Sequence, residues 1–186
     1  MGLAREQALL ARLYVDGSYR ERFFADPATV GQEANLPLAR IEAISRCEVE
    51  IRAFAHSLIH KRLVEIRGLL PATERALGDR FGPLARTYLE QHPPGGLDKP
   101  AEDARGLSRA LTALSDGEIP PWISELARYE GSRLIEEAGG LRVLQRLVIY
   151  RFPVVDLQRS LLRGDPLGTP RPRLTLVLEP VHRRRA

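Results

Sequence analysis

The spacing of apolar residues predicts that most of the chain is helical. Apolar positions recur at helical intervals in three early segments, residues 3–14, 18–25 and 38–70. The third segment predicts either one long helix or two helices with a bend between them. Asp26 followed by Pro27 predicts a further short helix ending near Asn35, because aspartate caps helices and proline suits the first helical position.

Helical spacing continues to about residue 138, with glycine and proline marking the ends of the helices. The expected helices cover residues 71–78, 81–91, 101–115 and 121–138. Gly78 is expected to end the first of them, since glycine commonly follows the last helical residue. The segment 92–100 is rich in proline and glycine, which indicates a loop.

The pattern changes after Gly139 and Gly140. Residues 141–150 are rich in leucine and β-branched side chains without helical spacing, which indicates a strand. A short helix is expected within residues 152–164. Residues 173–179 alternate as in a second strand, which places the leucines on one face and Thr, Val and Glu on the other.

These elements predict a mainly α fold of the α+β type, and the distribution of charge follows the same division. A multi-helix body is expected over residues 1–140 and a small, basic, β-containing module over residues 141–186. Residues 139–186 carry ten arginines and three acidic residues, whereas residues 1–138 carry 18 basic and 21 acidic residues. A basic segment of this kind favours an acidic partner.

Several classes of protein are excluded by composition. No apolar run approaches the length of about 18 residues that spans a membrane, so we expect no membrane segment. The N-terminal pattern interleaves charged and apolar residues, unlike a secretory signal. Cys47 is the single cysteine, which excludes an intrachain disulfide and a structural zinc site built on cysteines. We therefore expect a cytoplasmic protein.

The sequence holds little catalytic chemistry. It lacks a phosphate-binding glycine loop and the common hydrolase and metalloprotease motifs. His56 and His60 lie four residues apart and could share one helical face, but their neighbours Arg52 and Val64 supply no further ligand. We expect no metal, no cofactor and no catalysis by this chain; an autonomous metalloenzyme would instead carry stoichiometric metal. Cys47 is expected to be a small core residue.

Binding is the better interpretation of the C-terminal module. A pair of strands leaves edges without partners, and such an edge can accept an extended peptide as an added strand. We expect an acidic peptide to pair along residues 173–178. The candidate peptide-binding residues are Arg142, Arg146, Arg151, Arg171, Arg173, Leu174, Leu176 and Leu178. Alternatively, both strands pack fully against the helices and the arginines are simply solvated.

Nucleic acid is a second candidate partner, because phosphate contacts require only clustered basic residues. The chain would then be a DNA-binding transcriptional regulator. However, the helical body is slightly acidic, and none of the expected helices has a basic recognition face. We therefore rank this interpretation second.

Three motifs carry a resemblance to a known bacterial family. They are IHKRLVEIRGLLPATERALGDRFGPLARTYLEQHPP (59–94), IPPWISELARYEGSRL (119–134) and LQRLVIYRFPVVDL (144–157). The family was first described as a DNA-binding domain. The chain resembles it over about residues 55–160, which makes residues 38–140 a family-like helical core and residues 1–37 an N-terminal extension.

The resemblance implies a function as well as a fold. Members of this family are understood as partner subunits of multinuclear non-heme iron-dependent oxidases, TIM-barrel enzymes that modify ribosomally synthesised peptides. The resemblance implies that this chain binds the precursor peptide and presents it to the oxidase. The iron ligands would belong to the oxidase, in keeping with the absence of a metal-binding motif here.

Overall fold

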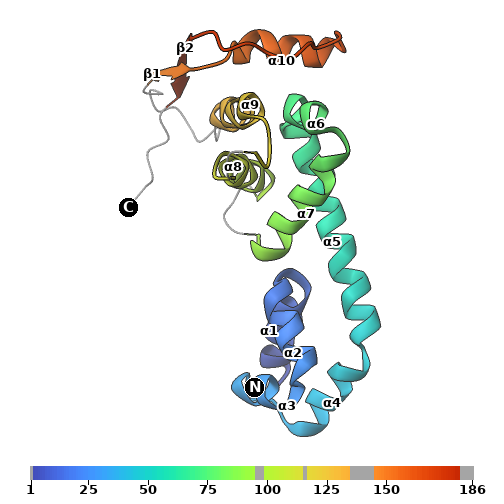
Figure 1. Ribbon diagram of the computed structural model, residues 1–186. Coiled ribbons are helices and arrows are strands. Elements are labelled where there is room, and N and C mark those ends of the chain that lie inside the picture. The colour runs from blue at the N-terminus through green and yellow to red at the C-terminus, as the bar shows by residue number, and fades with distance from the viewer. Residues whose placement is uncertain (1, 95–98, 115–116, 135–144, 181–186) are drawn as a thin grey trace. The chain divides into compact units, whose positions relative to one another are not determined.

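The computed structural model describes residues 2–94, 99–114, 117–134 and 145–180 (Figure 1). The elements are α1 (Gly2–Val15), α2 (Gly17–Ala25), α3 (Pro27–Glu33), α4 (Leu38–Arg46), α5 (Glu48–Leu69), α6 (Pro71–Leu77), the short 3-10 helix η1 (Gly78–Arg80), α7 (Phe81–Gln91), α8 (Lys99–Thr112), α9 (Pro121–Arg133), β1 (Gln145–Tyr150), α10 (Val154–Arg163) and β2 (Thr175–Pro180). The prediction of a mainly helical fold with a small β element near the C-terminus is confirmed. None of the described helices is both long and apolar enough to cross a membrane.

Contacts between residues divide the described chain into two compact units. Unit 1 comprises the described parts of Met1–Val64 and Arg86–Pro94, and unit 2 those of Glu65–Ala85 and Gly95–Ala186. This division differs from the sequence-based boundary near residue 140. The reason is that β1, α10 and β2 share one apolar cluster with α6 and α9, which places them in the same unit.

The second and third helices of unit 1, α2 and α3, each begin at an aspartate cap. The Asp16 carboxylate accepts the Tyr19 N–H at 2.8 Å, and Asp26 accepts the Thr29 N–H at 3.2 Å. Pro27 occupies the start of α3, so the prediction of a helix at Asp26-Pro27 is confirmed. The buried apolar side chains of α1 to α4 form the core of the unit around Phe23.

The segment 38–70 contains two helices, α4 and α5, which meet at Cys47. This residue ends α4, where its N–H donates to the Ile44 carbonyl at 3.0 Å. Cys47 is exposed, so the expectation of a core cysteine is wrong. The break between the helices turns Cys47 out of the apolar stripe that one continuous helix would have placed it beside.

Unit 2 is built around α9. Its buried cluster joins α6, α9, α10 and both strands through Ala72, Leu126, Tyr129, Tyr150, Val154, Leu161 and Val177. Gly78 follows α6 with a φ of 54°, a left-handed conformation that favours glycine, as expected from the sequence. The expected helix after Pro120 is present to Arg133; residues 135–144 and 181–186 lie outside the described part of the chain.

The two strands form one antiparallel sheet. Leu147 pairs with Leu178 and Ile149 pairs with Leu176, while Val148 pairs with Val177 on the opposite face. Beyond the strands, the Arg173 N–H donates to the Arg151 carbonyl at 2.7 Å. The sheet is short. Because side chains alternate between the two sides of each strand, the sheet has two distinct faces.

Helices α8 and α9 approach closely at Gly131. A Cβ added there would lie 2.6 Å from Ser108 Cβ, and Ser108 is buried with its hydroxyl donating to the Ala127 carbonyl at 2.6 Å. We expect Gly131→Ala to lower the free energy of unfolding by about 1–3 kcal/mol, because this serine cannot move without losing that hydrogen bond. Urea unfolding followed by the fluorescence of Trp122, the single tryptophan, measures the change.

Gly68→Ala is the matched control for this prediction. Gly68 lies within α5, and a Cβ there would meet nothing within 4 Å. Because alanine has the higher helix propensity, the control should leave stability unchanged or raise it by up to about 1 kcal/mol. Equal effects of the two substitutions would contradict the close approach of α8 and α9.

Candidate functional site

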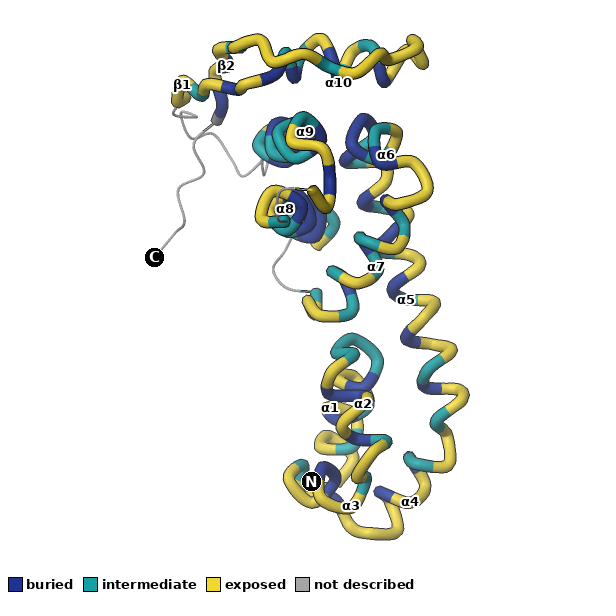
Figure 2. The backbone as a smooth tube through the Cα atoms, in the orientation of Figure 1, coloured by how far each residue is buried: buried dark blue, intermediate teal, exposed yellow. Residues whose placement is uncertain are grey.

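The face of the sheet that points away from the helices is apolar and exposed. It carries Leu147 and Ile149 from β1 and Leu176 and Leu178 from β2, with Leu174 directly before β2. These five side chains, here called the outer apolar face, are 58% to 74% exposed. Figure 2 shows exposed residues in yellow along the sheet. Isolated exposed leucines are common in proteins, but neighbouring ones on paired strands form a continuous apolar surface.

The opposite face of the sheet is held against α9. Its side chains are Val148, Tyr150, Val177 and Glu179, and Tyr150 and Glu179 are almost fully buried. The Tyr150 hydroxyl donates to the Glu179 carboxylate, and an Arg146 guanidinium nitrogen lies 3.2 Å from Glu179 Oε2. These polar contacts satisfy a carboxylate that would otherwise be costly to bury.

Tyr150 links the sheet to α9. The Arg128 guanidinium lies over its ring, 4.4 Å from the centroid, and the Tyr129 ring meets it edge to face. Burial, followed by the hydrogen bond to Glu179, raises the pKa of Tyr150 above its ordinary value, while Arg128 acts in the opposite direction. The neutral hydroxyl is therefore strongly favoured in the folded protein.

A second contact fixes the end of β1. The Glu125 carboxylate of α9 accepts the N–H groups of Arg151 and Phe152, at 2.8 Å and 3.0 Å. These two N–H groups lie in the turn between β1 and α10, so α9 positions the turn as well as the inner face. The outer apolar face is consequently presented on a fixed support.

The predicted leucines lie on the outer apolar face, and the predicted arginines that the structure describes lie around the sheet. Leu174, Leu176 and Leu178 are exposed and alternate with partly or fully buried residues, as the pattern predicts. The predicted arginines Arg146, Arg151, Arg171 and Arg173 are also exposed, and Arg142 lies outside the described residues. The sequence allowed either an exposed binding surface or strands packed fully against the helices. The inner face of the sheet packs against the helices, and the outer face is exposed.

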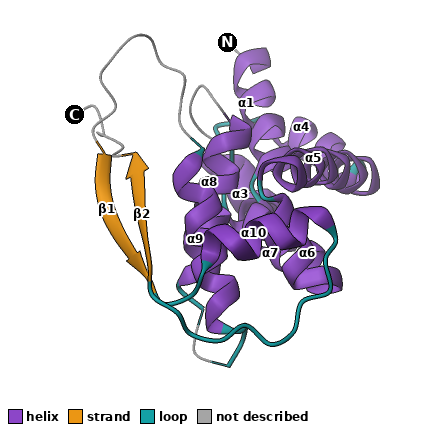
Figure 3. Cartoon of the chain, turned by 90° about the horizontal axis from the view of Figure 1, so that it is seen from above, coloured by secondary structure: helices purple, strands orange, loops and turns teal. Residues whose placement is uncertain are grey.

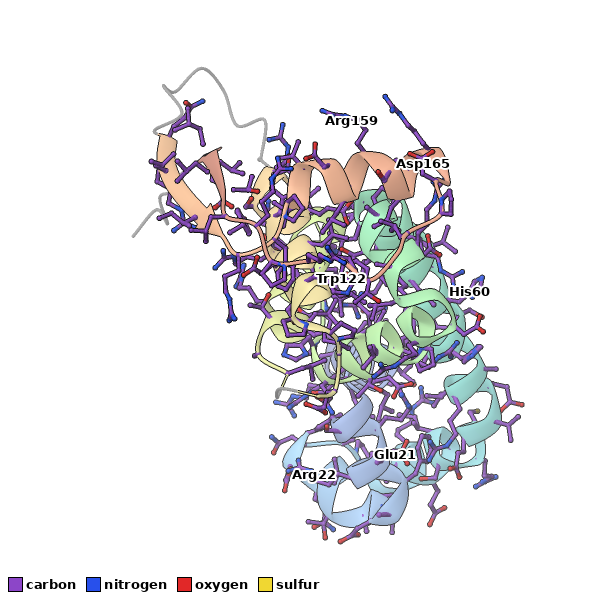
Figure 4. All side chains as sticks on the ribbon, turned by 45° about the horizontal axis from the view of Figure 1, so that its top comes forward. Glu21, Arg22, His60, Trp122, Arg159 and Asp165 are labelled. Carbon is purple, nitrogen blue, oxygen red and sulfur yellow. The ribbon has the colours of Figure 1, made fainter. Side chains whose placement is uncertain are left out.

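Charge around the sheet is mainly positive. Asp156 lies 3.8 Å from Arg173, and Glu179 pairs with Arg146. On α10 the exposed Arg159 projects on the side away from the other helices of the unit (Figure 4). Over residues 145–180 six arginines face three acidic residues, so the sheet lies in a positive field.

Each strand has one edge without a strand partner among the described residues, since the sheet has two strands. β2 is the strand nearer to α9, and β1 lies on the outer side (Figure 3). The edge along residues 173–178, which the sequence favoured, is therefore the one closer to the helices. The edge of β1 is the more accessible to an added strand.

Beside the inner face lies a cavity of about 420 Å³ between α8, α9 and β1. Its lining residues are Arg105, Ser108, Arg109, Thr112, Ala113, Arg128, Gly131, Ser132 and Arg146. We call it the arginine cavity. Of this set, only Arg146 is among the residues predicted from the sequence, because the other arginines come from helices distant in sequence. Leu147 and Ile149 are further binding candidates that the sequence pattern did not indicate; the antiparallel register places them opposite Leu178 and Leu176.

The other candidates of the sequence lie elsewhere. His56 and His60 are both exposed on α5. Within the described residues, no cluster of three or more His, Cys, Asp or Glu side chains could hold a metal ion.

Comparison with known protein families gives a match to part of the chain. A family described as "SCO6045-like, C-terminal domain" matches residues 48–113, about a third of the chain, from the start of α5 to just beyond α8. No curated protein and no solved structure matches the chain. The matched residues include the whole of the first motif, residues 59–94, but neither of the other two motifs and none of the sheet.

Proposed function

We propose that this chain is a non-catalytic partner protein that binds a precursor peptide on the β1–β2 sheet. The observation that carries the proposal is the outer apolar face. Large apolar patches on proteins commonly mark binding surfaces, because leaving them in water is unfavourable. A partner that covers this face would gain the free energy of burying five aliphatic side chains.

The form of the partner follows from the sheet. An extended peptide pairing with the outer edge of β1 would satisfy main-chain groups that no described strand pairs with. Its side chains on one face would extend the outer apolar face. The proposed peptide therefore has aliphatic residues at alternate positions.

Charge selects among such peptides. Exposed arginines lie within β1 and between the two strands, and Arg151 and Arg171 have no acidic side chain within ion-pair distance among the described residues. Acidic residues in the peptide would be attracted by this field, and basic ones repelled. We therefore propose an acidic peptide.

The resemblance described above supplies the wider context of the proposal. In that family, the peptide is the precursor of a ribosomally synthesised natural product, and the enzyme that receives it is a multinuclear non-heme iron-dependent oxidase. The same role is proposed here, with the iron bound by the oxidase. The sheet would hold the peptide, and helices of this chain would contact the enzyme.

Titration of a labelled peptide tests the proposal. The probe is a fluorescein-labelled peptide in which aliphatic residues alternate with glutamate, and binding is followed by fluorescence anisotropy. Arg171→Glu combined with Arg173→Glu should weaken binding several-fold, because it replaces attraction beside the sheet by repulsion. Unchanged affinity would contradict this surface.

The control reverses two other charges of the same unit. Arg159 and Arg163 are exposed on α10, outside the sheet. Arg159→Glu combined with Arg163→Glu changes the net charge by the same amount and should alter affinity much less. Equal losses of affinity in the two double variants would mean that peptide binding depends on net charge alone, which would contradict a specific site.

A salt titration separates peptide binding from binding to DNA. Affinity for duplex DNA falls steeply with salt, because each phosphate contact releases counterions. Strand addition combined with apolar burial should fall much less between about 50 mM and 200 mM salt. Tighter binding to a duplex than to the peptide, with a steep salt dependence, would favour the regulator instead.

A further inference from the structure

We infer that the arginine cavity is a carboxylate-binding subsite that receives one acidic side chain of the bound peptide. The inference rests on the proposed function and makes it more specific. Three elements build the cavity: α8 supplies Arg105 and Arg109, α9 supplies Arg128, and β1 supplies Arg146. Four guanidinium groups around about 420 Å³ form a positive cavity large enough for a carboxylate and its stem.

The charges of the cavity are not balanced within its lining. Among the described lining residues none is acidic. Glu179 pairs with Arg146 from the inner face of the sheet, and Arg105 is hydrogen-bonded to Leu134, so the positive charge available to a ligand is mainly that of Arg109 and Arg128. Like charges held together in one cavity repel each other, and an entering anion relieves this repulsion.

The arginines differ in how fully their donors are used. Arg105 donates to the Leu134 carbonyl at 2.6 Å, which holds its side chain in place. Arg128 stacks on Tyr150, yet its Nε is buried without a hydrogen-bond partner among the described residues. An unsatisfied buried donor on a charged group is costly, and an anion bound near this guanidinium would offset part of that cost through its charge.

The hydroxyl groups of the cavity do not compete for this role. Ser108 donates to the Ala127 carbonyl at 2.6 Å, and Ser132 donates to the Tyr129 carbonyl at 2.8 Å. Their protons are already used within the helices. Recognition therefore depends on guanidinium groups, whose planar fork matches the two oxygens of a carboxylate.

The position of Arg146 connects the cavity to the proposed peptide. Alternation along β1 places Arg146 on the inner face with Val148 and Tyr150, whereas Leu147 and Ile149 lie on the outer face. A strand added beside β1 alternates in the same way. Its outward side chains would extend the apolar face, and an inward side chain beside Arg146 would point toward the cavity.

The inference therefore gives the peptide a pattern. Aliphatic residues occupy alternate positions, and one intervening position carries an acidic side chain that binds in the cavity. A neutral residue of the same size at that position would lose the charge-assisted hydrogen bonds while keeping the strand pairing. The other acidic positions would interact only with exposed arginines in water, where ion pairs contribute little.

The test uses a series of peptides with acetylated and amidated ends, so that side chains supply every carboxylate. Each glutamate of the alternating peptide is replaced in turn by glutamine, and affinities for the full chain are measured by anisotropy. We expect one position at which the replacement weakens binding about tenfold, and smaller effects at the others. Equal, small effects at all positions would overturn the subsite.

Two variants of the protein complete the test. In Arg109→Gln, which changes an exposed arginine of the cavity, the large effect of that one glutamine should shrink to about twofold. Arg128→Gln should do the same. Arg133→Gln, on α9 but outside the cavity lining, should leave the effect intact. An undiminished effect in both cavity variants would overturn the inference.

Failure of the subsite and failure of the proposed function give different results. If the peptides bind the wild-type chain with affinities that do not depend on any single glutamate, the sheet binds peptides but the cavity does not bind a glutamate side chain. If none of the peptides binds, the proposed function itself is contradicted, and the inference is lost with it.

Discussion

Glu130→Ala is expected to lower the free energy of unfolding by about 3–5 kcal/mol. The Glu130 carboxylate is buried and accepts four hydrogen bonds. Its oxygens accept the Ala72 N–H at 3.0 Å, the Thr73 N–H at 2.7 Å, the Thr73 hydroxyl at 2.7 Å and the Gln158 amide at 3.2 Å. The variant leaves these buried donors without an acceptor, at a cost of about 1–3 kcal/mol for each group that stays unsatisfied.

The position of Glu130 explains why the effect should be large. The first N–H groups of a helix lack partners within it, and the residue before α6 provides no side-chain cap. Glu130 on α9 supplies the missing acceptor and also binds Gln158 of α10. One carboxylate thus ties three helices of unit 2 together.

Fluorescence of Trp122 during urea unfolding measures this prediction, because the tryptophan lies on α9 in the same unit. Glu130→Gln should recover only part of the stability, since its amide nitrogen cannot accept the N–H groups that it would face. Asp165→Ala, which removes an exposed acidic residue of unit 2, should cost less than about 0.5 kcal/mol. A loss that small in Glu130→Ala would mean that the helices do not depend on this carboxylate.

The helices were predictable because their signals are local. The cap at Asp26, the stop at Gly78 and the helix after Pro120 each depend on a few neighbouring residues, and each is present in the structure. Apolar spacing over residues 38–70 allows either one helix or two with a bend, and no proline or glycine marks the break that the structure places at Cys47. Its exposure depends on where α4 ends, which apolar spacing alone does not determine.

The burial of Glu179 is the clearest case of what local pattern could not predict. Alternation in β2 correctly separated the leucines from Val177 and Glu179, but apolar character alone would place the leucines inside. The structure buries Glu179 because Tyr150 and Arg146, about 30 residues earlier, satisfy its carboxylate. The exposed leucines and the buried glutamate are therefore two consequences of one long-range contact.

The arginine cavity could not be predicted for a similar reason. Sequence reasoning found the basic C-terminal segment as a run of charge, and Arg146 belongs to it. Arg109 and Arg128 belong to the helical body, whose net charge is slightly negative. Only packing of α8, α9 and β1 brings these three side chains to one cavity.

Tyr150→Phe is expected to lower the free energy of unfolding by about 1.5–3 kcal/mol at pH 7. It removes the hydroxyl that donates to the buried Glu179 carboxylate, and hydrogen bonds to charged groups contribute about this much. Arg146 remains as a partner of Glu179, which limits the loss. The measurement is again urea unfolding followed by Trp122.

The pH dependence of stability distinguishes this hydrogen bond from simple packing. Because the fold raises the pKa of Tyr150, the stability that it contributes is complete below the unfolded pKa of about 10. That contribution is lost as the pH rises above this value toward the folded pKa. The wild-type chain should therefore lose stability between about pH 9.5 and 11.5 more steeply than Tyr150→Phe, which has no proton to release there.

Glu179→Gln provides the matched control. It removes the charge beside the hydroxyl but leaves the burial of Tyr150, which is the larger cause of the raised pKa. The alkaline loss of stability should therefore be weaker than in the wild type and still present. Identical alkaline slopes in the wild type and Tyr150→Phe would contradict the buried pair. Because that pair joins β1 to β2 on the inner face of the sheet, Tyr150→Phe should also weaken peptide binding, although Tyr150 lies on the face opposite the exposed leucines.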